Sequence, residues 1–511
     1  MLADFSDGRS PAWMMVWLGG SLLVLYPLWN FIYNLIFHPL SRYPGPFLWR
    51  ASRLPHLRST WKGRLPNDVR DIHRKYGKIV RIAPNELSYA DPAAHATIYS
   101  HHGGTLPFPK PASWFAPQKG RPVSISNAVR RDDHARMRRK MEPAFTERAV
   151  AKQEVIVQGY SNLFVEKLRE KCEVGQGGTA IVDIVKYLTF TTVDVIGDLA
   201  FGESFHCLES DVIDDWVGLV FGYIKAAMLL ANLRQYPWVA AGLLSMIPKS
   251  DREKQQYLWD VIEKRVKKRL GLETDRPDFI ELWQKDDKGR NGLTRAELDA
   301  NTFIMVVAGS ETSATTLSAA LNFLMRNPEK LAILVDEVRE RFKSQEEITF
   351  ASLKELKYLD AVVKETFRVA SALPNGPPRI SPPEGAMLCG EYIPGNTYLS
   401  THDHTINFDP AFWHEADSFM PERWLADVPS NPESPFYNDN RGACLPFSVG
   451  PRSCIGKLLA LSSVRLLLTK LLWAFDIEKA NTPAGELLWE SQKVFMLVEK
   501  KPFEVKLTNR V

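Results

Sequence analysis

The sequence lacks the features that mark several common classes of protein. Its 511 residues include five cysteines, an odd number at irregular spacings, so a disulfide framework is not expected and a reducing compartment is favoured. No Asn-x-Ser/Thr glycosylation site occurs, which agrees with a cytosolic location for most of the chain. The net charge of +4 is too small to indicate nucleic-acid binding. There is also no Cys/His cluster with zinc spacing and no aromatic-basic array for stacking bases.

Charge is absent from one long stretch near the N-terminus, Pro11 to Phe37. This stretch exceeds the roughly 20 residues needed to span a bilayer. A cleaved signal peptide is the alternative, but the run is long, no small-residue cleavage site follows it, and the first ten residues are net acidic. We therefore expect a transmembrane anchor at 11–37 behind a short lumenal segment at 1–10. Four aromatic residues in the run are of the kind that lies at membrane interfaces, namely Trp13, Trp17, Trp29 and Tyr33.

The distribution of arginines predicts which side of the membrane the remainder occupies. Only Arg9 precedes the apolar run, whereas four arginines follow closely, at Arg42, Arg50, Arg53 and Arg58. By the positive-inside rule the part of the chain after the anchor faces the cytosol. No long linker, repeat or low-complexity segment interrupts that part, so 38–511 is expected to form one domain.

The fold is expected to be mainly α with a minor β region. The clearest helix starts with a capping box at Thr294 and Glu297 and stops at Asn327, before a proline. At 1.5 Å per residue it would be roughly 50 Å long, and it is apolar nearly all round, so it should run through the core. Strand-like stretches occur at Lys78–Ala83, Glu86–Ala90 and Lys493–Lys500.

The loop FSVGPRSCIG, Phe447 to Gly456, places a cysteine between two glycines just before an apolar helical stretch. A thiolate at a helix N-terminus is stabilised by the exposed amides, and it suits a soft metal or haem iron as partner. Gly450 and Gly456 have no Cβ and would let a flat ligand lie against the backbone. Arg452 would pair with a carboxylate of that ligand. Phe447 would pack against the sulfur of Cys454 and exclude water.

These residues give the pattern Phe-x-x-Gly-x-Arg-x-Cys-x-Gly, which would arise in a chain of this length with about one chance in ten thousand. The sequence here resembles the cytochrome P450 family of haem-thiolate monooxygenases. A structural cysteine in a turn is the alternative. The resemblance implies the cytochrome P450 fold, haem b (iron protoporphyrin IX) as cofactor, and Cys454 as the axial ligand of the haem iron. Phe447, Gly450, Arg452 and Gly456 would belong to the same cofactor site.

Further motifs match this family. Glu365 and Arg368 lie three residues apart in KETFR, and FMPERW supplies Arg423. The resemblance implies a buried, structural ion-pair network of these three. Glu-x-x-Arg alone is weak evidence, since Glu166 and Arg169 also satisfy it on an expected solvated helix face.

The segment AGSET, Ala308 to Thr312, lies midway along the long helix. The resemblance implies that Glu311 and Thr312 relay protons during oxygen activation; a polar helix face packed against water is the alternative. Three further residues are implied to hold the haem propionates: His134 and Arg138 in DDHARMRRK, and Arg379 in GPPRIS.

The function expected from this resemblance is a membrane-anchored monooxygenase that oxidises a lipophilic small molecule with O₂ and electrons from NADPH. The chain shows no flavin or nicotinamide domain, so the electrons would come from a separate NADPH-cytochrome P450 reductase. That partner would dock on the cysteine-side face, near Arg441, Lys457 and 136–140. Two rivals remain: a haem-thiolate isomerase or dehydratase, which needs no external electrons, and a non-enzymatic haem sensor.

The segments YNLIFHPLSRYPGP and TTVDVIGDLAFGESF look most like microsomal enzymes of fungal secondary metabolism, which implies a single-pass endoplasmic reticulum protein. Apolar candidates for the substrate pocket favour a hydrophobic molecule of the terpenoid or polyketide type. These candidates are Phe303, Val307, Ala308, Leu373, Phe495, Trp114 and Phe115.

Overall fold

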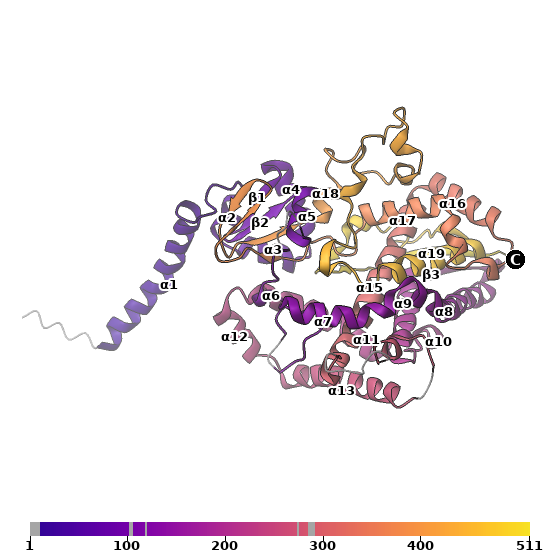
Figure 1. Cartoon of the computed structure of the whole chain (residues 1–511), viewed down its shortest axis with the longest axis horizontal. Helices are drawn as coiled ribbons and strands as arrows, with labels where there is room; N and C mark the ends of the chain where they lie inside the picture. Colours follow the sequence, from indigo (N-terminus) through magenta and orange to yellow (C-terminus); the bar gives the residue numbers. More distant parts are fainter. Residues whose placement is uncertain (1–10, 102–105, 118–119, 273–274, 285–291, 511) are drawn as a thin grey trace, which may run out of the picture.

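The computed structural model of the chain describes residues 11–101, 106–117, 120–272, 275–284 and 292–510. Helices form most of the molecule, and the strands are short and form small sheets, which confirms the prediction of a mainly α fold with a minor β region (Figure 1). The α-helices are α1 (Pro11–Ile36), α2 (Phe47–Ala51), α3 (Leu54–Trp61), α4 (Leu65–Tyr76), α5 (Pro92–Tyr99), α6 (Ala112–Phe115), α7 (Arg131–Met141), α8 (Glu147–Val174), α9 (Ile184–Phe201), α10 (Cys207–Ser210), α11 (Asp215–Leu233), α12 (Pro237–Ser245), α13 (Lys249–Leu270), α14 (Phe279–Gln284), α15 (Arg295–Arg326), α16 (Pro328–Arg341), α17 (Lys357–Val369), α18 (Asp403–Asn407) and α19 (Lys457–Ala474).

The strands form small sheets that join distant parts of the chain. One sheet has the order β1-β2-β7-β4, a second has the order β3-β11-β8, and two hairpins pair β5 with β6 and β9 with β10. Their bounds are β1 (Ile79–Ala83), β2 (Glu86–Tyr89), β3 (Thr179–Asp183), β4 (Arg379–Ile380), β5 (Ala386–Leu388), β6 (Glu391–Ile393), β7 (Tyr398–Thr401), β8 (Phe475–Lys479), β9 (Lys493–Val494), β10 (Val498–Glu499) and β11 (Glu504–Asn509).

The predicted strand-like stretches are found as strands. The first two become β1 and β2, and the stretch at Lys493–Lys500 contains a tight hairpin of β9 and β10 that turns at Met496 with φ 97°. The parallel pairing of β2 with β7 spans about 300 residues and leaves no local signal in the sequence.

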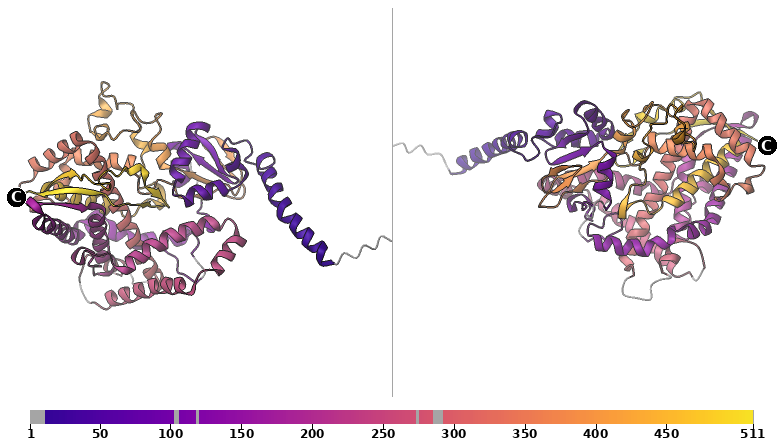
Figure 2. Two further views of the ribbon diagram at one scale, coloured as in Figure 1. Left: turned by 180° about the vertical axis from the view of Figure 1, so that it is seen from behind. Right: turned by 45° about the horizontal axis from the view of Figure 1, so that its top comes forward.

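The predicted long helix is α15, which begins with the Thr294–Glu297 capping box and ends at Arg326. It runs through the interior and packs against α9, α17 and α19 (Figures 1 and 2). Gly309 lies at the contact with α9, where an added Cβ would come within 2.5 Å of Ile196 Cδ1. The glycine therefore lets the two helices approach closely next to the site described below.

Helix α1 extends away from the rest of the molecule (Figures 1 and 2). Apolar side chains in its second half, such as Leu28 and Trp29, are exposed. Its C-terminal end is held to the body, because Arg81 donates to Asn34 O at 2.8 Å and Asn34 Nδ2 donates to Ala51 O at 2.9 Å.

Among the residues whose side chains are described, one helix, α11, is long and apolar enough to cross a membrane. It belongs to the body, since its Trp216 is buried and donates to Leu258 O of α13 at 3.0 Å.

Candidate active site

The cysteine loop is held in one conformation by its backbone. The Cys454 N–H donates to Phe447 O at 2.9 Å, and both Ser448 and Gly450 have positive φ. At Gly450 an added Cβ would lie 2.3 Å from Tyr99 O, so glycine is required there both by conformation and by space. Helix α19 begins at Lys457, three residues after Cys454.

A cavity of about 370 Å³ lies beside this loop, and Cys454 is exposed to it. The cavity joins three parts of the chain: the cysteine loop, the middle of α15, and the segment between α17 and β4. Cys454 and Thr312 are far apart in the sequence, yet both line this cavity. The predicted residues among its lining are Phe447, Arg452, Cys454, Gly456, Thr312, Arg379, Ala308 and Leu373.

Opposing influences act on the pKa of the Cys454 thiol, and burial is the largest of them. Burial raises the pKa of the Cys454 thiol. The Gly456 N–H and the positive charges of Arg138 and Lys457 act in the opposite direction. A cation bound at the sulfur would favour the thiolate further.

Arg379 and Arg452 line one edge of the cavity, and Lys110, which does not line it, lies close enough for its charge to interact with theirs. Arg379 is buried and bonds to the carbonyls of Pro377 and Pro378, while Arg452 bonds to Ala128 O at 2.8 Å. Lys110 is also buried; its Nζ donates to Ser126 O at 2.5 Å. Within the described parts of the chain, no carboxylate forms an ion pair with these three side chains.

Burial and mutual repulsion lower the pKa values in this cluster. Burial and the charge of Arg379 lower the pKa of Arg452 to about 10. Burial, followed by the charges of Arg452 and Lys110, lowers the pKa of His134 to about 3. A ligand with two carboxylates would neutralise such a cluster, so the donor set fits the propionates of a haem. Sequence reasoning missed Lys110, which lies in no motif.

Arg138 contacts the cysteine loop, and its predicted bond to a haem propionate stays a prediction. Its Nη1 donates to Ser453 O at 2.6 Å, directly before the cysteine, and neither Arg138 nor His134 lines the cavity. His134 is buried on α7 close enough to Arg452 for their charges to interact. The bond from Arg138 therefore fixes the backbone next to the cysteine.

On α15 the two predicted relay residues face different cavities. Thr312 lines the 370 Å³ cavity, and its Oγ1 donates to Ala308 O at 2.6 Å. Glu311 lines a second cavity, of about 430 Å³, and accepts a hydrogen bond from Lys500 Nζ at 2.5 Å. Lys500 was not among the predicted residues, and no motif marks it.

The residues predicted for the substrate pocket also lie in different places. Ala308 and Leu373 line the first cavity, whereas Phe495 lines the second. Phe303 packs instead in an aromatic cluster with Trp216, Tyr223 and Trp259. Val307, Trp114 and Phe115 are not among the residues that line either cavity.

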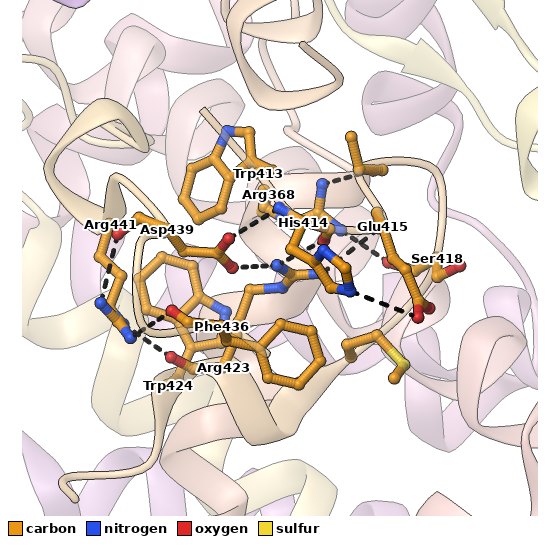
Figure 3. A network of polar contacts seen from close by, with 12 residues as sticks. Arg368, Trp413, His414, Glu415, Ser418, Arg423, Trp424, Phe436, Asp439 and Arg441 are labelled. Carbon is orange, nitrogen blue, oxygen red and sulfur yellow. Dashed lines mark hydrogen bonds and ion pairs between the residues drawn. The ribbon is translucent and has the colours of Figure 1, made fainter. Parts of the chain in front are cut away.

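The structure brings Glu365, Arg368 and Arg423 into one buried network. Arg368 Nη2 donates to Glu365 Oε1 at 2.7 Å, and Arg423 Nε donates to the same oxygen at 3.2 Å. Asp439, which sequence reasoning missed, pairs with the other end of Arg423 (Figure 3). Two arginines therefore meet two carboxylates, and Trp424 Nε1 donates to Glu365 Oε2 at 2.7 Å. This balance allows four charges to be buried together.

The residues expected to contact the reductase differ in whether their side chains are free to reach a partner. Lys457 and Arg139 are exposed. Arg136 is engaged by Glu297, and Arg441 donates to the backbone carbonyls of Arg423 and Phe436.

Comparison with known proteins identifies the family. The family model described as Cytochrome P450 matches residues 42–507. This chain belongs to the cytochrome P450 family. It is 38% identical over 493 residues to cytochrome P450 monooxygenase atr2 of Stereocaulon alpinum, covering 96% of this chain and 95% of that protein.

Two further relatives are named as hydroxylases. Averantin hydroxylase of Dothistroma septosporum is 38% identical, with 96% of this chain and 91% of that protein covered. Trichothecene C-15 hydroxylase of Fusarium sporotrichioides is 35% identical, with 98% of this chain and 99% of that protein covered. The cytochrome P450 is therefore a monooxygenase, and the predictions of a haem b cofactor and of NADPH-derived electrons from a redox partner are confirmed at the level of the family. The isomerase and sensor alternatives gain no support from these relatives.

Proposed function

We propose that this cytochrome P450 is a membrane-anchored enzyme that hydroxylates a lipophilic small molecule in a fungal secondary-metabolite pathway. The observation that carries the proposal is that Cys454, Thr312 and the basic cluster of Arg379 and Arg452 border one cavity. Two relatives are named as hydroxylases of averantin and of a trichothecene, which supports a substrate of polyketide or terpenoid type. Apolar groups such as Ala308 and Leu373 would contact it.

The residues of the site have separable tasks in this proposal. The haem, when bound, supplies the oxidising chemistry. Cys454 would bind its iron, and Arg379 and Arg452, with Lys110 and His134 beside them, would hold its carboxylates. Gly450 and Gly456 keep the backbone of the loop free of side chains, and Phe447 shields the sulfur.

Proton transfer is assigned to α15. The Thr312 hydroxyl lies at the cavity surface, where it can accept a proton from one neighbour and pass one to another. Glu311 would supply these protons from the second cavity. A positioned proton-transfer group typically contributes about 10²- to 10⁴-fold to a rate.

The segment 11–37 is proposed to anchor the enzyme in the endoplasmic reticulum membrane, with 1–10 in the lumen and the catalytic domain, 38–511, in the cytosol. Exposed apolar side chains on α1 support this. Others occur nearby on α2 and α12, including Phe47, Leu48 and Leu243. NADPH-cytochrome P450 reductase would supply the electrons and would contact the exposed Lys457 and Arg139.

The test is the spectrum of the reduced protein with carbon monoxide. Wild type should show the red-shifted Soret band of a thiolate-bound haem, and Cys454→Ala should lose it because no other cysteine is found among the described residues that line the cavity. Cys444→Ala is the matched control, because burial raises the pKa of the Cys444 thiol and that residue does not line the cavity. A band that survives Cys454→Ala would refute the assignment of the ligand.

A further inference from the structure

The cavity beside Cys454 has an acid in its wall, Asp403, which is the first residue of α18. Asp403 lines the cavity together with His95 and Arg379, and its side chain is 15% exposed. Among the described residues the carboxyl group has one contact with another ionisable side chain, at 3.8 Å between Asp403 Oδ1 and His95 Nε2, and it accepts no hydrogen bond. A buried acid without such bonds is costly when it is charged.

Asp403 lies next to the edge of the cavity that Arg379 and Arg452 line. The ring of Tyr99 contacts the ring of His95, with 4.7 Å between their centroids, and the guanidinium carbon of Arg379 lies 4.8 Å from the Tyr99 centroid. The positive charge of Arg379 also reaches His95, since it lowers the pKa of that histidine. Because His95 in turn contacts Asp403, the acid lies near the place that fits the carboxylates of a haem.

The titratable groups that surround Asp403 on other elements are neutral at pH 7. Burial, followed by the charge of Arg379, lowers the pKa of His95 to about 4, so this histidine supplies no positive charge. Burial raises the pKa of Tyr99 and of Cys444, and a negative charge on Asp403 would raise both further. The contact between His95 and Asp403 is therefore not an ion pair at this pH.

The two histidines beside Asp403 in the sequence contact other partners. His402 Nδ1 lies 3.3 Å from Asn375 Oδ1, and His404 Nε2 lies 2.9 Å from Asn67 Oδ1. Burial raises the pKa of Asp403 to about 7. A large part of the Asp403 side chains is thus protonated at neutral pH, and a protonated carboxyl group can donate a hydrogen bond.

We propose that Asp403 is a further residue of the haem site and that its protonated carboxyl group donates a hydrogen bond to a haem carboxylate. The inference deepens the proposed haem site and rests on it. Arg379 and Arg452 would bind the haem carboxylates as cations, whereas Asp403 would bind as a neutral acid. His95 fills the space beside this acid without adding a charge.

Haem binding and protonation of Asp403 should support each other. An ionised Asp403 would repel the haem carboxylates, whereas a protonated one makes a charge-assisted hydrogen bond to them. Haem binding therefore raises the pKa of Asp403, and the proton comes from solvent. Because the protonated form binds better, the affinity for haem should be highest below the pKa of Asp403 in the haem-free protein and should fall as the pH rises above it.

The experiment measures the equilibrium partition of haem between this protein and apomyoglobin at pH 6 and pH 9. Asp403→Asn keeps a hydrogen-bond donor without an ionisable group, and Asp403→Leu removes both. Asp417→Asn is the matched control, since it removes an acid that is 74% exposed. Lys110, near the same edge, also has a lowered pKa, so variants are compared with wild type at each pH.

The two pH values should give opposite orders. At pH 6 wild type and Asp403→Asn should retain haem equally, and Asp403→Leu about tenfold more weakly, because the donor is lost. At pH 9 wild type should retain haem about tenfold more weakly than Asp403→Asn, because only wild type must protonate an acid or hold a negative charge against the haem. Asp417→Asn should behave as wild type at both.

Infrared spectroscopy of the haem-containing proteins at pH 6 gives an independent readout. Wild type and Asp417→Asn should show a protonated-carboxyl band that Asp403→Asn lacks. An unchanged band in Asp403→Asn, or equal haem partition of wild type and this variant at pH 9, would overturn the inference. If Asp403→Asn does not fold, Asp403→Ser, also a neutral donor, takes its place. A wild-type protein without the thiolate spectrum would instead refute the assignment of Cys454, while partition and infrared data would still report on Asp403.

Discussion

At the scale of single residues, removal of the Thr312 hydroxyl tests whether this residue serves packing or proton transfer. It already donates to Ala308 O, a bond common for threonine in helices and of little consequence for stability. We expect Thr312→Ala to keep its haem and its thermal stability. Product formation should fall about 10- to 100-fold, because proton delivery would be misdirected and more NADPH would end as hydrogen peroxide.

The measurement is the fraction of consumed NADPH that is recovered as peroxide, with Thr312→Ser as the matched variant that keeps a hydroxyl. If alanine and serine give the same fraction as wild type, Thr312 is a packing residue.

The basic edge of the cavity offers a second residue-scale test. Lys110 is buried, no carboxylate within the described residues pairs with it, and burial and the charges of Arg452 and Arg379 hold its pKa well below the ordinary value. We expect Lys110→Met to stabilise the haem-free protein by relieving this repulsion and to weaken haem retention about tenfold, because one charge-assisted bond to a carboxylate is lost. Haem transfer to apomyoglobin measures the retention; equal transfer rates for wild type and variant would exclude Lys110 from the site.

At the scale of elements, the network around Glu365 links α17 to the loop that precedes the cysteine. Arg423→Met would leave Glu365 and Asp439 with one fewer cation between them. Loss of one member of a buried pair typically costs about 3–5 kcal/mol, so the variant should unfold at lower temperature and accumulate without haem. Arg169→Met is the control, since Arg169 belongs to the same Glu-x-x-Arg pattern on the partly exposed face of α8. Similar melting temperatures for the two variants would contradict this account.

At the scale of the whole molecule, the attachment of α1 predicts how truncation should act. Deletion of residues 1–37 should move much of the enzyme from the membrane to the soluble fraction while haem binding survives. The same deletion removes Asn34 O, which accepts a hydrogen bond from the buried Arg81. The protein without residues 1–37 should therefore melt at a lower temperature than the protein without residues 1–30. Fractionation and thermal melts of both forms check this; loss of haem in both would mean that the segment belongs to the catalytic fold.

The pH dependence of stability follows from histidines buried in the region of α4 and the β1-β2-β7-β4 sheet. Burial lowers the pKa of His73 to about 4 and the pKa values of His402 and His404 to about 3. The folded state keeps them neutral, whereas the unfolded chain binds protons below about pH 6.5. The free energy of unfolding should therefore fall as the pH drops from 6.5 toward 4, by up to about 1.4 kcal/mol per histidine and pH unit.

Melting temperatures at pH 7 and pH 5 test this dependence. His404→Gln can still donate to Asn67 Oδ1, which His404 Nε2 contacts at 2.9 Å, but it cannot bind the extra proton. Its melting temperature should fall less between the two pH values than that of wild type. An equal fall would assign the acid sensitivity to other groups.

The sequence by itself determined the family-defining loop, the long core helix and the mainly helical class. These depend on residues close together in the chain: the glycines around Cys454, the capping box before α15, and the periodicity of apolar residues. Only the tertiary structure decided which way Glu311 points, that the charge of Lys110 lies near Arg379 and Arg452, that Asp439 balances Arg423, and that the C-terminal stretch folds as a hairpin. The reason is that the partners of these groups come from distant segments, so no local pattern records the charge or the space that each will meet.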